Sequence, residues 1–378
     1  MRSLLFTEAF WPKIGGLEVI LVQLLRGLTA RGHEVLVVTD RGDDALRMED
    51  RLGDVRICRL PFARALAERD LGLVADLVER LRELECEFAP DLIHATFAGP
   101  SIWYLPRLKS APLLLDCHGS WSDARILSND LFRRVILGAA QLTACSQAVL
   151  GDMLGAAPEM ADRAMVISPG LEAPVVQGPL EPTGGPPMIL ASGRMVFEKG
   201  LDVALEAMAQ IASRRPDARL VLVGDGPSRP ALERQAGELG IRDKVTFTGW
   251  IAPDRTAQLR AEATLVLVPS RGEGFGLVAL EAAQMARPVV ASDVGGLPEI
   301  VSHGMTGTLV PVGDARALAG AALALLGDPE LAARYGRAGR MRALTRFSSS
   351  RHLDAWDGLY RDFAIRREAH GRSNVFSV

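Results

Sequence analysis

The chain alternates between short apolar runs and longer amphipathic runs. Apolar runs of strand type include Ser3–Thr7, Glu34–Thr39 and Pro112–Cys117, and the segments Leu17–Arg31 and Leu66–Phe88 have helical spacing. Strands that are apolar on both faces, with helices between them, favour a parallel sheet that is covered on both sides. The first part of the sequence therefore predicts a doubly wound α/β domain.

A segment rich in proline and glycine interrupts this pattern at residues 168–187. It reads SPGLEAPVVQGPLEPTGGPP and keeps no period, which is typical of a linker or a long loop. The alternation resumes at Met188 and continues to a strand candidate at Thr308–Val310. We therefore expect an N-terminal domain over residues 1–170, a linker over 171–187 and a second doubly wound domain over 188–354.

Two such domains in one chain predict a deep cleft between them. In open α/β sheets, ligands bind beyond the carboxyl ends of the strands. The loops that follow strands are therefore the places to search for functional residues.

The composition limits the partners of the chain. Hydrophobic residues make up 48% and charged residues 24% of its 378 residues, which suits two packed cores. The net charge of −3 disfavours general binding of nucleic acid, which usually needs a basic excess. The four cysteines form no C-x-x-C pair and no cluster with metal spacing, so we expect free thiols in a reducing compartment.

The sequence carries no pattern of a signal peptide or a membrane span. The apolar run at the N-terminus is short and ends at Glu8, so a buried strand explains it better than a signal peptide. No stretch reaches the length of about 18 apolar residues that a spanning helix needs. We expect a cytoplasmic protein. Arg133 and Arg134 leave peripheral contact with the inner face of a membrane open, although a solvated helix face explains them more simply.

The strongest functional pattern is EGFGLVALE, from Glu273 to Glu281, which follows the strand candidate LVLVPS. Its glycines make a turn with few side chains, and a helix opens near Leu277. Such a turn exposes backbone N–H groups, and the helix N-terminus adds partial positive charge, so a phosphate can bind there. Glu273 is placed to accept from sugar hydroxyls and Glu281 to reach a ribose diol. The alternative is an ordinary strand–helix connection with two solvated glutamates.

A second loop, GRMVFEKG at Gly193–Gly200, follows the strand candidate MILAS. It carries Arg194 and Lys199, and two cations at the carboxyl end of a strand suit a diphosphate. The alternative is that both are ordinary exposed cations, which is the common fate of arginine and lysine.

Two weaker patterns lie in the first domain. Gly15 and Gly16 follow the first strand and precede a helix, which lets the backbone approach a ligand closely. His118 follows the strand PLLLDC, where it would face the cleft and hydrogen-bond a sugar hydroxyl or assist a proton. A structural loop histidine is an equally good reading of His118.

Several other signatures are missing from the sequence. It contains no G-x-G-x-x-G after a strand, no P-loop, no G-x-S-x-G and no H-E-x-x-H, which disfavours dehydrogenases, P-loop enzymes, serine hydrolases and zincins. No strict D-x-D is present, so a metal-bound donor is not indicated. Glu273 and Glu281 could form the carboxylate pair of a glycoside hydrolase. Their place on a glycine turn near two cations fits a phosphate ligand better.

Together these segments resemble glycosyltransferase family 4. EGFGLVALE resembles the E-x7-E signature of that family, GRMVFEKG its G-R-x-x-x-x-K-G loop and KIGG its N-terminal glycine loop. ASDVGGLPEIV, GTLVPVGD and ACSQAV are also similar to family segments. The likeness covers most of the chain and is densest between Met188 and Leu326. One departure is Pro169, where the family often has asparagine before glycine.

The resemblance implies the GT-B fold, which consists of two Rossmann-like domains facing a deep cleft. A C-terminal helix, at about residues 355–370, would pack back on the first domain. The chain would be a retaining hexosyltransferase that uses a nucleotide diphosphate sugar, UDP- or GDP-linked, as co-substrate. It would need no metal and no other cofactor. The N-terminal domain would bind a hydroxyl-bearing acceptor and the C-terminal domain the donor.

The resemblance also assigns roles to the site residues. Arg194 and Lys199 would bind the diphosphate and stabilise the leaving group, and Glu281 would hold the ribose. Glu273 and the glycine turn would hold the donor sugar. The implied catalytic residues are Arg194, Lys199, Glu273 and His118, and the implied donor-binding residues are Gly16, Gly274, Phe275, Gly276, Leu277 and Glu281.

Three other functions use the same residues. A sugar-nucleotide epimerase of the same fold would convert the donor without an acceptor. A non-catalytic protein would bind a sugar nucleotide only, and a glycoside hydrolase would ignore nucleotides. The acceptor stays open between a glycan, a lipid and a small molecule.

Overall fold

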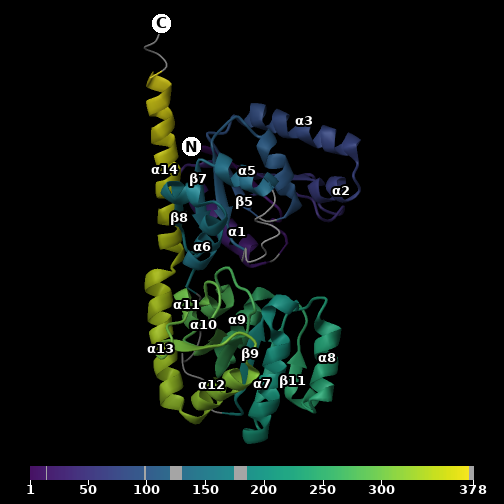
Figure 1. Cartoon of the computed structure of the whole chain (residues 1–378), viewed down its shortest axis with the longest axis vertical. Coiled ribbons are helices and arrows are strands. Elements are labelled where there is room, and N and C mark those ends of the chain that lie inside the picture. Colours follow the sequence, from purple (N-terminus) through teal and green to yellow (C-terminus); the bar gives the residue numbers. More distant parts are fainter. Residues whose placement is uncertain (14, 98, 120–129, 174–184, 374–378) are drawn as a thin grey trace. The chain divides into compact units, whose positions relative to one another are not determined.

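The computed structural model of the chain describes residues 1–13, 15–97, 99–119, 130–173 and 185–373 (Figure 1). The chain divides into two compact units. Unit 1 consists of Met1–Gly170 and Ser349–Val378, and unit 2 consists of Leu171–Ser348. Residues 174–184, which form most of the predicted linker, lie outside the described residues.

Unit 1 is built on an eight-stranded sheet with the order β3-β4-β2-β1-β5-β6-β7-β8. Neighbouring strands are parallel except β3 and β4, which form an antiparallel pair at one edge. The sheet consists of β1 (Arg2–Thr7), β2 (Glu34–Asp40), β3 (Glu49–Leu52), β4 (Val55–Leu60), β5 (Leu92–Phe97), β6 (Leu113–Cys117), β7 (Gln141–Ala144) and β8 (Ala164–Val166).

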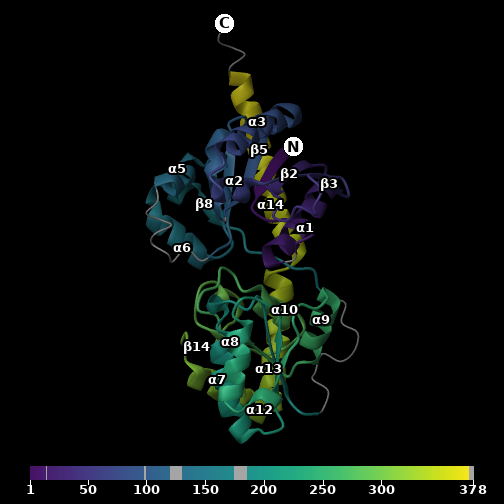
Figure 2. The same cartoon turned by 90° about the vertical axis from the view of Figure 1, so that its right-hand side faces the viewer.

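The helices of unit 1 include one that comes from the far end of the chain. This helix, α14, lies beside α1 in unit 1 (Figures 1 and 2). Trp356 and Tyr360 of α14 pack with Leu24 and Leu28 of α1 in one apolar cluster, so the C-terminal segment completes the core of unit 1. The helices are α1 (Gly16–Ala30), α2 (Phe62–Ala67), α3 (Leu71–Phe88), α5 (Asp130–Gly138), α6 (Gln147–Ala156) and α14 (Ser349–Ser373), with 3-10 turns η1 (Pro100–Arg107) and η2 (Pro158–Arg163).

The segment with helical spacing, Leu66–Phe88, is divided between two helices, and the break between them was not predicted. α2 ends at Ala67 and α3 begins at Leu71. The carboxylate of Asp70 accepts a hydrogen bond from Leu73 N at 3.0 Å, which caps a new helix start. Arg69 has φ +55°, a left-handed conformation that no helix continues through.

Unit 2 is built on a six-stranded parallel sheet with the order β11-β10-β9-β12-β13-β14. In sequence order this is 3-2-1-4-5-6, the arrangement of dinucleotide-binding domains, and the strand order reverses between β9 and β12. Ligands of such sheets bind at this reversal point. The strands are β9 (Met188–Ser192), β10 (Arg219–Val223), β11 (Val245–Phe247), β12 (Leu265–Val268), β13 (Val289–Ser292) and β14 (Gly307–Val310).

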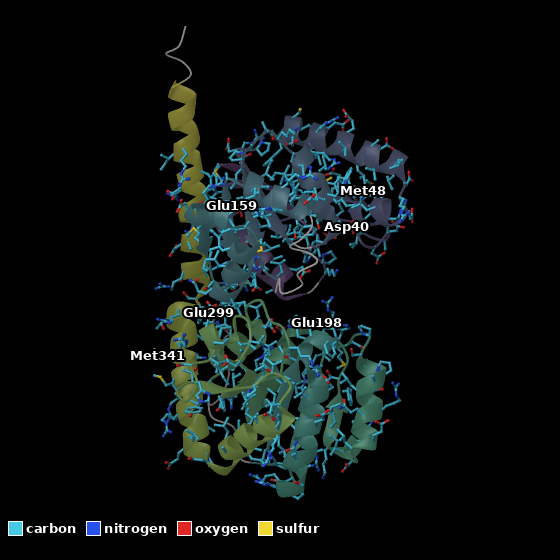
Figure 3. The ribbon with its side chains drawn as sticks, viewed as in Figure 1. Asp40, Met48, Glu159, Glu198, Glu299 and Met341 are labelled. Atoms are coloured by element: carbon cyan, nitrogen blue, oxygen red, sulfur yellow. The ribbon has the colours of Figure 1, made fainter. Side chains whose placement is uncertain are left out.

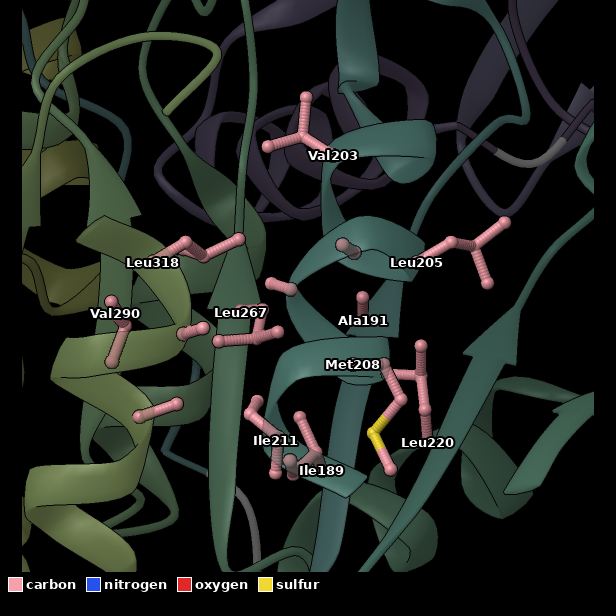
Figure 4. Packing of buried hydrophobic residues seen from close by; sticks show 14 of the residues in the cluster. Ile189, Ala191, Val203, Leu205, Met208, Ile211, Leu220, Leu267, Val290 and Leu318 are labelled. Carbon is pink, nitrogen blue, oxygen red and sulfur yellow. The ribbon is translucent and has the colours of Figure 1, made fainter. Parts of the chain in front are cut away.

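The core of unit 2 is an apolar layer between helices and sheet. Met208 and Ile211 on α7 are fully buried against Ile189 of β9 and Leu220 of β10 (Figure 4). Burial on this scale stabilises each large side chain by about 2 kcal/mol. The helices are α7 (Leu201–Arg214), α8 (Arg229–Glu238), α9 (Pro253–Glu262), α10 (Leu277–Gln284), α11 (Leu297–Ile300), α12 (Ala315–Gly327) and α13 (Pro329–Arg346), with 3-10 turns η3 (Phe197–Lys199) and η4 (Arg242–Lys244).

The prediction of two doubly wound α/β domains is confirmed. The antiparallel edge formed by β3 and β4 was not predicted, because residues 49–52 (EDRL) are polar and give no strand pattern. Within the described ranges, no helix combines the length and the apolar character that a membrane crossing requires.

Candidate active site

The loops after β9 and β12 meet at the reversal point of the unit 2 sheet. Lys199, at the end of the β9 loop, places Nζ 2.8 Å from Oε2 of Glu273, which follows β12 and lies 74 residues further along the chain. The hydroxyl of Ser270 donates to the same oxygen at 3.1 Å. The structure therefore joins two of the predicted catalytic residues in one ion pair.

The loop that carries Lys199 is fixed by a close backbone approach. Gly200 has φ +61°, and a Cβ at this position would lie 1.9 Å from the carbonyl oxygen of Pro269. Only glycine fits there without a shift of the backbone. Arg271 N also donates to the carbonyl of Glu198 at 2.7 Å, which ties the two loops together, while the side chain of Glu198 is exposed (Figure 3).

Arg194, the second predicted cation, lies in the same loop but does not join this ion pair. Its side chain is exposed, and within the described residues its guanidinium has no hydrogen-bond or ion-pair partner. The neighbouring backbone is held by Met195, whose N–H donates to Asp225 O at 2.8 Å. The loop places Arg194 at the carboxyl end of β9 with its charge available to an anion.

The glycine turn after Glu273 leads directly into α10. Gly276 is the N-cap residue with φ +109° and caps with no side chain. The N–H groups of Leu277 and Val278 have no carbonyl of their own helix to bind, because they lie in its first turn. Such a helix start attracts anions.

Gly295 and Gly296, which follow β13, lie against the backbone of this turn. A Cβ at Gly295 would lie 1.8 Å from Glu273 O, and a Cβ at Gly296 would lie 2.6 Å from Gly274 O. Gly296 N also donates to Glu273 O at 3.2 Å. The segment after β13 therefore packs backbone to backbone against the predicted donor turn and fixes its course.

The side chain of Phe275 packs in the hydrophobic core and is not available to a ligand. Its side chain is only 5% exposed, and its ring packs edge-on against that of Phe347 at 5.6 Å. Of the predicted Phe275 contacts, only those of its backbone are available to a donor.

Glu281 lies one turn into α10 and has a cationic partner of its own. Nη2 of Arg260, on α9, is 2.7 Å from Oε2 of Glu281. The structure thus gives each predicted carboxylate a different cation, Lys199 for Glu273 and Arg260 for Glu281.

In unit 1, His118 follows β6 and pairs with a buried carboxylate. Its Nε2 is 2.5 Å from Oδ2 of Asp116, whose side chain is only 2% exposed. Burial alone would lower the pKa of His118, but the Asp116 carboxylate outweighs it and raises that pKa to about 10. Burial likewise opposes the charge of Asp116, yet His118 and His94 hold its pKa well below the usual range. At neutral pH His118 is therefore an imidazolium.

Gly16 is the first residue of α1, and Gly15 is its N-cap residue in an extended conformation. The predicted glycine turn therefore does precede a helix N-terminus, although Ile14 lies outside the described residues.

Five residues of this arrangement were not predicted as site residues from the sequence. Ser270 lies three residues before Glu273, and Asp116 lies near the end of β6, two residues before His118. Gly295 and Gly296 were noticed only within a family segment. Arg260 gave no signal, because an arginine in a polar helix resembles a surface residue.

Among the described residues, no group of three or more histidine, cysteine, aspartate or glutamate side chains is arranged to hold a metal ion. Metal independence stays a prediction.

Two family models match the chain. One described as Glycosyl transferases group 1 matches residues 186–328, and one described as Glycosyltransferase Family 4 matches residues 14–173. A GDP-mannose-dependent alpha-(1-6)-phosphatidylinositol monomannoside mannosyltransferase from Mycobacterium tuberculosis is 30% identical over 364 residues, which cover 90% of this chain and 92% of that protein. The chain belongs to glycosyltransferase family 4.

Solved structures agree with this membership. Sucrose-phosphate synthase from Thermosynechococcus elongatus superimposes on this glycosyltransferase with a TM-score of 0.81 and 25% identity, over 97% of this chain and 100% of that one. Anabaena HepE in complex with UDP-glucose gives a TM-score of 0.75 and 23% identity, over 98% and 100% of the two chains. The predicted GT-B fold class and the prediction of a glycosyltransferase are confirmed.

Proposed function

We propose that this glycosyltransferase moves a hexose from a UDP- or GDP-sugar to a hydroxyl-bearing acceptor, with retention of anomeric configuration and without a metal. The observation that carries the proposal is the 2.8 Å contact between Lys199 and Glu273 beside the N-terminus of α10. A cation, a carboxylate and a helix start at one sheet edge suit a ligand that combines phosphate with a polyol.

The diphosphate binds to the cations and to the helix start. Arg194 offers a planar fork of donors and Lys199 a point charge, and both lie on the loop after β9. Negative charge grows on the diphosphate as the glycosidic bond breaks. Preorganised cations at that position stabilise the transition state more than the ground state, which is how they accelerate transfer.

The carboxylates bind the sugars of the donor. Glu281 accepts from the ribose hydroxyls, and Glu273, held by Ser270 and Lys199, accepts from the hexose. Gly16 and His118 act in the same reaction from unit 1, which binds the acceptor. As an imidazolium, His118 serves as a hydrogen-bond donor to a sugar oxygen rather than as a base.

The donor class draws support from the relatives. The mycobacterial relative is named as dependent on GDP-mannose, and HepE is described in complex with UDP-glucose. Retention of configuration rests on the resemblance of EGFGLVALE to the family signature.

The test is a panel of UDP-, GDP-, ADP- and dTDP-sugars, scored by thermal stabilisation and by slow hydrolysis of the donor, with and without EDTA. We expect one donor to stabilise the protein and to be consumed equally in EDTA. Lys199→Ala should abolish most of both effects. The matched control is Lys244→Ala. Lys244 lies in the same unit but immediately before β11, at the amino end of a strand, whereas the candidate site lies at the carboxyl ends.

Two results would contradict the proposal. Conversion of one sugar nucleotide into another without acceptor would indicate an epimerase. Wild-type hydrolysis in Lys199→Ala would show that the site lies elsewhere.

A further inference from the structure

Arg260 is a charged side chain buried inside unit 2. Its side chain is 8% exposed, and its Nη2 lies 2.7 Å from Oε2 of Glu281. The Nε atom is buried and has no hydrogen-bond partner within the described residues. A buried charge is costly unless it is paired, so the position of Arg260 requires the carboxylate of Glu281.

Glu281 is the more open member of this pair. Its side chain is 35% exposed, and no other group in the described ranges pairs with its carboxylate. One oxygen is therefore held from the protein side, and Oε1 remains for a ligand on the solvent side. A carboxylate held in this way loses little rotamer freedom when it binds, which favours affinity.

Resting on the proposed function, we infer that Arg260 is a positioning residue that fixes the Glu281 carboxylate for the ribose hydroxyls of the donor nucleotide. The guanidinium does not contact the ligand. It acts through the 2.7 Å contact with Oε2, which orients the free oxygen. The pair therefore determines how strongly the enzyme distinguishes a ribonucleotide from a deoxyribonucleotide.

A purely structural pair would behave differently. Loss of a structural contact lowers stability and weakens all nucleotides alike, which leaves the ratio between two related ligands unchanged. Loss of a positioning contact reduces the ratio itself, because only the ribonucleotide uses the oriented oxygen. The ratio of two dissociation constants therefore separates the two roles.

The experiment measures binding of UDP and GDP, and of their 2′-deoxy and 3′-deoxy forms, to the full chain by calorimetry. For the nucleotide that binds, we expect the wild type to lose about tenfold in affinity for each missing hydroxyl that meets Glu281. Glu281→Gln, Arg260→Met and Arg260→Gln should each reduce this loss to about twofold. Arg260→Met should also raise KM for the donor more than it lowers kcat.

The matched control is Arg255→Met. Arg255 lies on the same helix and pairs with Glu262 at 3.6 Å, but both side chains are about half exposed, at 50% and 47%. This variant should keep the wild-type ratio. Arg260→Gln carries the test if the methionine variant does not fold, because it keeps a polar side chain in the buried position but removes the charge that pairs with Glu281.

The outcomes separate this inference from the proposed function. The ratio of the dissociation constants for the deoxynucleotide and the ribonucleotide decides between them. If a folded Arg260 variant keeps the wild-type ratio while Glu281→Gln reduces it, the role of Arg260 is overturned and the proposed function stands. Failure of the wild type to bind either nucleotide would overturn both. A reduced ratio in the Arg260 variants, with a normal ratio in Arg255→Met, would establish the positioning role.

Discussion

Nε2 of His118 lies 2.5 Å from Oδ2 of Asp116, and Oδ1 of the same carboxylate accepts from Thr143 Oγ1 at 2.8 Å. The pair sits at the carboxyl end of β6, and Asp116 is buried. Burial opposes both charges, yet their attraction prevails and moves the two pKa values apart. His118, which was predicted from its place after a strand, is thus held in its charged form by Asp116, two positions earlier.

Replacement of Asp116 by asparagine should lower the pKa of His118 from about 10 to below neutrality, because burial then acts without the opposing charge. It should also destabilise unit 1 by about 3 kcal/mol at pH 7, because the attraction that keeps His118 charged in the folded protein is lost. NMR titration of the His118 ring and urea unfolding at pH 7 measure the two effects. An unchanged titration would contradict the assigned pair.

The free energy of unfolding should first rise and then fall as the pH increases. Burial lowers the pKa of His352 to about 4, so between pH 4 and about 6.5 the unfolded chain binds more protons and stability increases with pH. The raised pKa of His118 has the opposite effect, and its contribution is lost as pH rises from about 6.5 through about 10.

His352→Asn should therefore remove most of the increase in the free energy of unfolding between pH 4 and about 6.5 (the acid limb), which amounts to about 3 kcal/mol. The native Nδ1–H of His352 donates to Ser168 O at 3.0 Å, and the buried Nε2 has no partner in the described chain, so a second proton is disfavoured there. Urea unfolding from pH 4 to 8 measures the slope, with His303→Asn on the exposed surface as control. An acid limb that persists in His352→Asn would be evidence against this assignment.

Gly295→Ala should lower both stability and donor affinity. The new Cβ would lie 1.8 Å from Glu273 O, so the donor turn must move. The control is Gly304→Ala, which also has a positive φ, at +74°, but open space around it. We expect a cost of about 1 kcal/mol at Gly304 from backbone conformation alone and several times more at Gly295. Equal costs would mean that the close approach is not rigid.

Arg194→Ala should reduce transfer without affecting the fold. Its guanidinium has no partner in the described chain, so stability should stay within about 0.5 kcal/mol while kcat/KM falls by about 100-fold. The control is Arg234→Ala, because Arg234 is also exposed but lies on α8. This variant should change neither stability nor kcat/KM. The test combines thermal unfolding with donor kinetics. A drop in melting temperature that parallels the loss of activity would contradict a direct role.

Much of the fold and some of the site follow from local pattern. The alternation of apolar and amphipathic runs predicted both α/β units, because burial on two faces shows directly in composition. The glycine turn and the first turn of α10 were predicted from residues within one segment, EGFGLVALE. The break at Asp70 was missed, because the helical spacing of apolar residues continues on both sides of it. The cap at Asp70 does not change that spacing.

Local runs of residues predict which loops carry cations, carboxylates and glycines. Which of these side chains meet depends on how strands and helices pack. Lys199 reaches Glu273 because β12 pairs with β9, and Asp116 meets His118 in a buried setting that strand residues alone do not reveal. Arg260 became a partner of Glu281 through the packing of α9. Each contact depends on the order of strands and the packing of helices far apart in sequence, and this order results from burial of the whole core rather than from any local run of residues.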